Sequence, residues 1–228
     1  MLPIRSITPA SLLQSYSSER VGAAREIIDE AGKSTRFMAP PTRGFRLLRD
    51  AVLSLSLSQP FVGPLYHWRT SRPHEYGTSP LNSADDDNHL FEAGPGHGAP
   101  PLNLRLGPDD YLLDHLGGGF DLLYFTDGTP VPAQWCEVAR MARGRGVGLR
   151  IVAISSQAAA QPVQGADLTL ADADGRCRAR HGVPAGHPPG AAYLLRPDQH
   201  VCARWLALDA RRLQSAIDNA TCTQGVPA

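Results

Sequence analysis

The chain has 228 residues, 42% of them hydrophobic, and a formal net charge of zero at pH 7. This length suffices for one or two domains with a buried core. The balanced charge gives no electrostatic case for nucleic acid or an anionic membrane as partner. Because no run of about 18 apolar residues occurs, we expect no transmembrane helix. The first residues lack a secretory signal pattern, so the expected location is cytoplasmic.

The four cysteines, Cys136, Cys177, Cys202 and Cys222, lie far apart in the sequence. They form neither a CxxC pair nor a close cluster with histidine, so their spacing predicts no zinc site. A cytoplasmic chain keeps its thiols reduced. We therefore expect ordinary buried or half-buried thiols and no bound metal.

Residues 1–66 are predicted to be a helical segment. From about residue 9, apolar residues recur at three- and four-residue intervals, which predicts an amphipathic helix that stops at Gly32 or continues to Met38. After a Pro-Pro break, Thr42 is a candidate N-cap for a second amphipathic helix. The neighbouring sequence offers these helices no packing partner. We expect them to pack on the second domain, on another subunit or on a domain outside this chain.

Residues 67–103 are predicted to be a long irregular linker, because they are rich in proline and glycine and show no helical or strand period. The acidic run Asp85–Asp87 lies there among several histidines. Their spacing is irregular, and we expect the backbone to be mobile. The sequence therefore favours a solvated loop over a metal site.

Residues 104–228 alternate strand and helix patterns and predict an α/β domain. FDLLYF at Phe120–Phe125 and LRIVAI at Leu149–Ile154 are almost continuous apolar runs, typical of strands that are buried on both faces. A helix is predicted between them at about Pro132–Arg143. The two strands should therefore pair in parallel through a right-handed crossover.

A hairpin closes the predicted sheet. Its strands are Ala192–Leu195 and His200–Trp205, and Pro197 and Asp198 suit the turn between them. Together, the predicted strands and helices of this domain indicate a thioredoxin-like mixed sheet with flanking helices. The remaining predicted elements are a short helix at Asp110–Leu116, a short strand or helix at Ala166–Leu170 and a terminal helix at Asp209–Asn219.

The residues of this domain form no catalytic constellation. In a thioredoxin-like domain the reactive cysteine follows the first central strand, where the N-terminus of the next helix lowers the thiol pKa. Here that loop, Thr126–Pro132, contains no cysteine, and Cys136 lies further on within the helix. Gly117–Gly119 precedes a strand instead of linking a strand to a helix, so it does not predict a phosphate-binding loop. Asp172 and Asp174 are predicted to cap a turn.

The chain contains, in this order, the segments SLLQSYSSERVGAAREII, RFMAPPTRGFRLLRDAVLSLS, YGTSPL, GGGFDLLYF and YLLRPDQHVCARW. Together they resemble the region after the flavin domain in class A FAD-dependent aromatic monooxygenases. These enzymes are the relatives of 3-(3-hydroxyphenyl)propionate hydroxylase, phenol hydroxylase and the polyketide aromatic hydroxylases. The last two segments resemble their C-terminal thioredoxin-like domain.

The resemblance implies FAD and NAD(P)H as cofactors of a complete family member, which hydroxylates a phenolic substrate with oxygen. That family binds FAD through an N-terminal GxGxxG, an internal DG motif and a GD motif, and none of these is found here in its family context. No catalytic or cofactor-binding residue is therefore implied in this chain, and no FAD bound by it alone. The implied role is packing or subunit association, with a flavin-domain partner chain or as a homo-oligomer.

Two alternatives stay open. The segments DADGRCRARHGV and RPDQHV resemble peroxiredoxin strands, so the chain could be an independent thioredoxin- or peroxiredoxin-like thiol protein. Cys136 is then the nearest candidate for its reactive thiol. The chain could also be a stand-alone oligomerisation module. The first alternative requires a reactive cysteine, and the second requires self-association.

Overall fold

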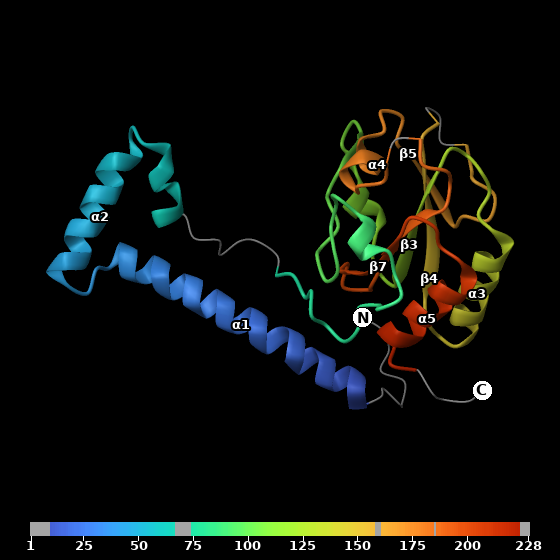
Figure 1. Ribbon diagram of the computed structural model, residues 1–228, viewed down its shortest axis with the longest axis horizontal. Coiled ribbons are helices and arrows are strands. Elements are labelled where there is room, and N and C mark those ends of the chain that lie inside the picture. The colour runs from blue at the N-terminus through green and yellow to red at the C-terminus, as the bar shows by residue number, and fades with distance from the viewer. Residues whose placement is uncertain (1–9, 67–73, 158–160, 185, 224–228) are drawn as a thin grey trace. The chain divides into compact units, whose positions relative to one another are not determined.

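The computed structural model describes residues 10–66, 74–157, 161–184 and 186–223. The chain divides into two compact units (Figure 1). One consists of Tyr16–His74 and is named the helical unit. The other combines the start of the chain up to Ser15 with Glu75–Ala228 and is named the sheet unit.

Over its described residues, 10–66, the segment predicted to be helical consists of helices. Helix α1 spans Ala10–Met38, α2 spans Arg43–Ser56, and the 3-10 helix η1 spans Pro60–Leu65. The hydroxyl of Thr42 accepts the backbone N–H of Phe45 at 3.3 Å, which is the predicted N-cap of α2. The predicted start of α1 near residue 9 lies outside the described residues. Within the described ranges, no helix has the length and apolarity that crossing a bilayer demands.

The sheet unit contains the predicted mixed sheet. Its five strands lie in the order β5-β4-β3-β6-β7. The central strand β3 pairs in parallel with β4 and antiparallel with β6, so a β-α-β unit and a hairpin share one sheet, as in a thioredoxin-like domain. The strands are β3 Phe120–Thr126, β4 Leu149–Ser155, β5 Leu168–Ala171, β6 Ala191–Leu195 and β7 Val201–Trp205.

Helices and loops cover both faces of this sheet. Helices α3 (Ala133–Gly144) and α5 (Ala210–Ala220) lie side by side over one face (Figure 1). There the Trp135 ring meets the Tyr124 ring edge-on, with 5.3 Å between centroids. The other face is covered by the short helix α4 (Arg176–Arg180) and by loop residues. The two layers explain why β3 is buried along its whole length.

One buried carboxylate interrupts this apolar strand. Asp121 of β3 lies opposite Arg150 of β4 and accepts a hydrogen bond from its Nε at 2.8 Å. The backbone N–H of Gly117 donates to the other carboxylate oxygen at 2.8 Å. Burial raises the pKa of Asp121, and the bonds from Gly117 and Arg150 oppose that rise. A buried charge is tolerated here because both of its oxygens have donors.

The predicted short helix at Asp110–Leu116 is found only in part, as the 3-10 helix at Leu112–His115, and its predicted start is wrong. The chain forms a two-residue strand β2, Asp110–Tyr111, which pairs with β1, Arg105–Gly107. A 3-10 turn, η3 at Leu112–His115, follows. The physical reason is that Tyr111 pairs with Arg105 across this small hairpin, which holds Tyr111 in an extended conformation (φ −129°, ψ 147°) that an α-helix does not contain.

Residues 75–103, which we expected to be part of a linker, belong to the same compact unit as the sheet. We name them the strap; they include the 3-10 helix η2, Asn88–Leu90. The strap runs along β7, since Ser83 N–H donates to Cys202 at 2.7 Å and Val201 N–H donates to Ala99 at 2.9 Å. Because β7 is an edge strand of the sheet, these bonds cover backbone groups that would otherwise be unpaired.

The acidic run of the strap is not the solvated loop that the sequence favours. The Asp86 side chain is 4% exposed and accepts the backbone N–H of Arg204 at 2.9 Å. Asp87 accepts the backbone N–H of Leu206 at 2.9 Å and forms an ion pair with Arg212 of α5 at 2.7 Å. Burial raises the pKa of Asp87, but the bonds from Arg212 and Leu206 outweigh it and the net pKa is lowered. The carboxylates thus fasten the strap to β7.

Candidate functional site

The loop between β3 and α3 is where a thioredoxin-like domain carries its reactive cysteine. Here the buried hydroxyl of Thr126 donates to the carbonyl of Thr129 at 2.9 Å and accepts the N–H of Gly128 at 3.1 Å. The carboxylate of Asp127 accepts both the N–H and the hydroxyl of Thr129, at 3.0 and 2.6 Å. These bonds lower the pKa of Asp127. The polar groups of the loop are therefore used within the loop itself.

The same loop does not fit the pyrophosphate of a dinucleotide cofactor. The side chain of Gln157 donates to the carbonyl of Asp127 at 2.9 Å. A Cβ atom on Gly128 would lie 2.2 Å from that side-chain nitrogen, so Gln157 already fills the space over the loop's glycine. The Gly117–Gly119 run precedes β3, and the Gly117 N–H is used by Asp121. Neither of these two loops therefore offers a backbone cradle for phosphate.

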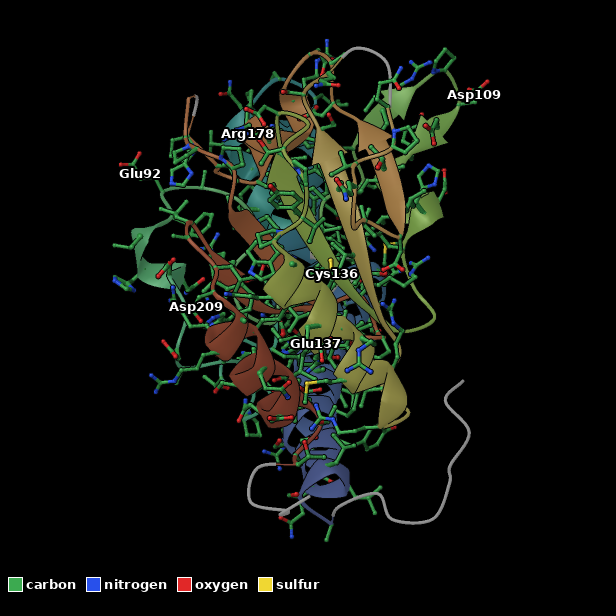
Figure 2. The ribbon with its side chains drawn as sticks, turned by 90° about the vertical axis from the view of Figure 1, so that its right-hand side faces the viewer. Glu92, Asp109, Cys136, Glu137, Arg178 and Asp209 are labelled. Carbon is green, nitrogen blue, oxygen red and sulfur yellow. The ribbon has the colours of Figure 1, made fainter. Side chains whose placement is uncertain are left out.

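The structure joins none of the four cysteines to another: Cys177 and Cys202 are buried and Cys136 and Cys222 are half-buried, as the sequence predicts. Cys136 is half-buried on α3, and its thiol donates to the carbonyl of Gly165 at 3.5 Å. Figure 2 shows Cys136 beside Glu137 on this helix and apart from Arg178 of α4. Burial raises the pKa of the Cys202 thiol to about 12 and raises that of Cys177 as well. None of these surroundings favours a thiolate.

A cysteine–histidine contact that the sequence analysis missed lies on α4. The Sγ of Cys177 is 3.7 Å from Nδ1 of His181, but the same Nδ1 also donates to the backbone carbonyl of Cys177 at 2.7 Å. His181 is fully buried, and burial lowers its pKa to about 4. The ring is therefore neutral near pH 7 and cannot stabilise a thiolate by charge. The only sequence signal was the four-residue spacing of the pair.

The predicted turn caps Asp172 and Asp174 are confirmed. The carboxylate of Asp172 accepts the N–H groups of Cys177 and Arg178, each at 2.8 Å, and Asp174 accepts the N–H of Arg176 at 3.1 Å. They satisfy the first N–H groups of α4, which is the ordinary role of an N-terminal aspartate. Within the described ranges, no group of three or more metal-binding side chains is close enough to hold an ion.

The helical unit differs from the sheet unit in what it exposes. Ala23, Val52 and Val62 are the buried apolar residues among those described in it. Apolar patches of this kind on a protein surface mark contact sites. The large apolar side chains that it exposes by 43% to 90% are Tyr16, Val21, Ile27, Ile28, Met38, Phe45, Leu47, Leu48, Leu53, Leu55, Leu57, Phe61 and Leu65.

Part of this apolar surface forms a groove with a volume of about 280 Å³. Val52 of α2 is its most buried lining residue at 4% exposure, whereas Leu48 of the same helix is 57% exposed. The aromatic ring of Phe37 stacks on Tyr66, with 6.5 Å between ring centroids. The groove is lined by Lys33, Arg36 and Phe37 of α1, by Phe45, Leu48 and Val52 of α2, and by Leu65 of η1.

No protein-family model matches this chain, and no curated sequence matches it significantly. Solved structures of flavin-dependent monooxygenases do match its fold. The flavin-dependent monooxygenase PieE, solved with FAD and substrate, matches 94% of this chain with a TM-score of 0.61 and 21% identity. A variant of the rebeccamycin biosynthetic enzyme RebC matches 92% with a TM-score of 0.56 and 22% identity. Aklavinone-11 hydroxylase, solved with FAD and aklavinone, matches 94% with a TM-score of 0.52 and 21% identity.

The chain spans 40% of the PieE chain and 36% of the RebC variant and of aklavinone-11 hydroxylase. At these identities the match establishes the fold: the chain folds like one region of flavin-dependent aromatic monooxygenases. The match includes most of both units, because it covers more than nine tenths of the chain.

Proposed function

We propose that the chain is the C-terminal, non-catalytic part of an FAD-dependent aromatic hydroxylase, where it serves packing and subunit association. The fold match to three such enzymes supports this role, and so does the share of their length, 36% to 40%, that the chain spans. The remainder of such an enzyme is named here the flavin-binding region. It belongs either to the same polypeptide or to a partner chain.

The observation that carries the proposal is the exposed apolar surface of the helical unit. Fully burying one Leu or Phe side chain is worth about 1.5–3 kcal/mol, so leaving many of them in water forfeits much of the stability that a domain needs. Leu57 is 90% exposed and Met38 is 73% exposed. Such a unit is stable when another protein surface covers it. In this proposal the flavin-binding region covers the helical unit.

The sheet unit has a structural role in this proposal. In the loop between β3 and α3, Thr126 and Asp127 form hydrogen bonds within the loop. The side chain of Gln157 fills the space over the same loop that a phosphate would need. FAD and NAD(P)H therefore bind to the flavin-binding region. With both cofactors bound, that region would supply the hydroxylation of an aromatic substrate with oxygen. The assembly works in the cytoplasm.

Two measurements on the purified chain test the proposal. When the chain is mixed with FAD and then passed over a gel-filtration column, it should carry no flavin absorbance. Flavin that stays with the chain would contradict the proposal that this part is non-catalytic. Mixed with the flavin-binding region of the hydroxylase encoded at its own genomic locus, the chain should form a complex. Failure of the two to associate would overturn the proposal.

The stand-alone oligomerisation module is the second candidate function, because the same exposed surface also fits a second copy. Sedimentation velocity separates the two candidates. The proposal expects the chain to bind the flavin-binding region as one copy to one, whereas a stable homodimer that ignores that region supports the module. No contact of the described residues favours the thiol-protein alternative.

A further inference from the structure

Positive charge collects in the part of the helical unit that forms the groove. From Ala31 to Tyr66 the sequence has a single carboxylate, Asp50. The same stretch has five cations, so its formal charge is +4, although the whole chain is neutral. The cations are Lys33, Arg36, Arg43, Arg46 and Arg49.

Two of these cations already have partners. Lys33 pairs with Glu30 one turn earlier on α1, and Arg49 pairs with its neighbour Asp50 at 2.8 Å. Among the described residues, no ion pair joins Arg36, Arg43 or Arg46 to a carboxylate. Arg36 contributes directly to the lining of the groove.

We infer that the groove receives an apolar segment of the flavin-binding region that carries carboxylates beside its apolar side chains. This inference rests on the proposed function and specifies the chemistry of its contact. The apolar side chains cover Phe45, Leu48 and Val52, and one carboxylate pairs with Arg36. Charge complementarity of this kind fixes the register of an interface and speeds its formation.

The shape of the site favours a protein segment over a lipid surface. Val52 at the groove is 4% exposed while Phe45, Leu48 and Leu65 around it are 45%, 57% and 51% exposed. The site is therefore hollow, with three apolar walls above a buried residue, and suits side chains that insert as knobs. A helix that lies on a membrane instead presents one continuous apolar face to the lipid, with no hollow between its apolar side chains.

The test measures the affinity of the full chain for the flavin-binding region encoded at its genomic locus, by isothermal titration calorimetry. The variant Arg36→Glu should weaken binding by about tenfold or more, because it places like charges together. Arg25→Glu makes the same charge change at an exposed position of the same helix outside the groove, and should change the affinity by less than about twofold. Far-ultraviolet circular dichroism checks that both variants keep their helix content.

A second pair of variants tests the apolar half of the inference. Leu48→Ala should weaken binding by about tenfold or more, since it removes a wall of the groove. Met141→Ala truncates a side chain that is 50% exposed on α3 of the sheet unit, outside the groove, and should leave the affinity within about twofold.

The outcomes separate this inference from the function on which it rests. If the unaltered chain does not bind the flavin-binding region, the proposed function fails. If it binds, but Arg36→Glu and Arg25→Glu have equal affinities, the function stands and the groove is not the contact. Binding to phosphatidylglycerol vesicles that Arg36→Glu abolishes, or a homodimer that Arg36→Glu dissociates, would assign the groove to a lipid surface or a second copy and overturn the inference.

Discussion

The hydroxyl of Thr126 donates a hydrogen bond of 2.9 Å to the carbonyl of Thr129. The bond closes the loop after β3 on itself, at the position where a thioredoxin-like domain would present a reactive thiol. The Thr126 hydroxyl also accepts the N–H of Gly128 at 3.1 Å, so one side chain holds both ends of the turn. A loop built in this way serves the stability of the sheet unit, and its substitutions should be visible in the free energy of unfolding.

The variant Thr126→Val should lower the free energy of unfolding by about 1–2 kcal/mol. It keeps the shape of the buried side chain but removes the hydroxyl that bonds to the carbonyl of Thr129 and to the backbone N–H of Gly128. Urea unfolding followed by tryptophan fluorescence measures the change. Thr129→Val is the matched control, because its hydroxyl bonds only to the exposed Asp127, and it should cost less than about 0.5 kcal/mol. Equal costs for the two variants would contradict the structural role of Thr126.

The thiols should react as buried or hydrogen-bonded groups and not as a redox centre. Cys177 and Cys202 should resist a thiol reagent until the protein unfolds, because burial raises the pKa of both thiols. Peroxide consumption by the folded chain should be no faster than that of free cysteine at the same pH. A fast rate that Cys136→Ser removes would support the thiol-protein alternative instead.

The stability of the sheet unit should fall in mild acid because of His181. Burial lowers the pKa of its imidazole from 6.5 to about 4, so between these values the unfolded chain binds a proton that the folded chain does not. The contribution is fully present above pH 6.5 and is lost as the pH falls toward 4. The difference in pKa corresponds to about 3 kcal/mol.

Urea unfolding at a series of pH values measures this contribution as a difference between proteins. His181→Gln should be less sensitive than the unaltered chain to acid in that window. His187→Gln, which alters a less buried histidine of the same unit, should keep the original pH dependence. The assignment fails if His181→Gln and the unaltered chain lose stability in parallel.

Arg204 of β7 should be the residue on which the strap most depends. Its guanidinium donates to the side chain of Asn88 at 2.7 Å and to the carbonyl of Ala93 at 3.0 Å, and lies 4.5 Å from the centroid of the Phe91 ring. Lysine cannot make this set of planar contacts, so Arg204→Lys should cost about 2 kcal/mol of unfolding free energy. Hydrogen exchange should show faster exchange of the strap amides in that variant. Arg140→Lys, on an exposed surface of α3, should change neither quantity.

Continuous apolar runs made the centre of the fold predictable. FDLLYF and LRIVAI encode strands that are buried on both faces, and the structure places them as the neighbouring parallel strands β3 and β4. The hairpin was equally predictable, because its turn chemistry is local: Pro197 and Asp198 occupy the turn that the Gln199 N–H closes by donating to the carbonyl of Arg196 at 2.8 Å. The absence of a reactive thiol in the β3–α3 loop could likewise be read from the sequence.

The strap could not be predicted, because its partners lie far away along the chain. Asp86 bonds to the backbone of Arg204, 118 residues later, and no local pattern encodes that contact. Strand β2 was mistaken for the start of a helix for a related reason, since it is the pairing of Tyr111 with Arg105 that holds this residue in an extended conformation. The groove is lined by residues of α1, α2 and η1 together, so no local sequence pattern predicts its hollow shape.

The central claim is that the apolar surface of the helical unit is an interface with a flavin-binding region. The most direct measurement is hydrogen exchange of the α2 backbone amides, Arg43–Ser56, in the full chain alone and with that region added. In the chain alone, these amides should exchange fast, because Ala23, Val52 and Val62 are the buried apolar residues among those described in the helical unit. In the complex, they should exchange at least about tenfold more slowly. Amides of α2 that exchange as slowly as those of β3 in the chain alone, or that do not respond to the added region, would contradict this claim.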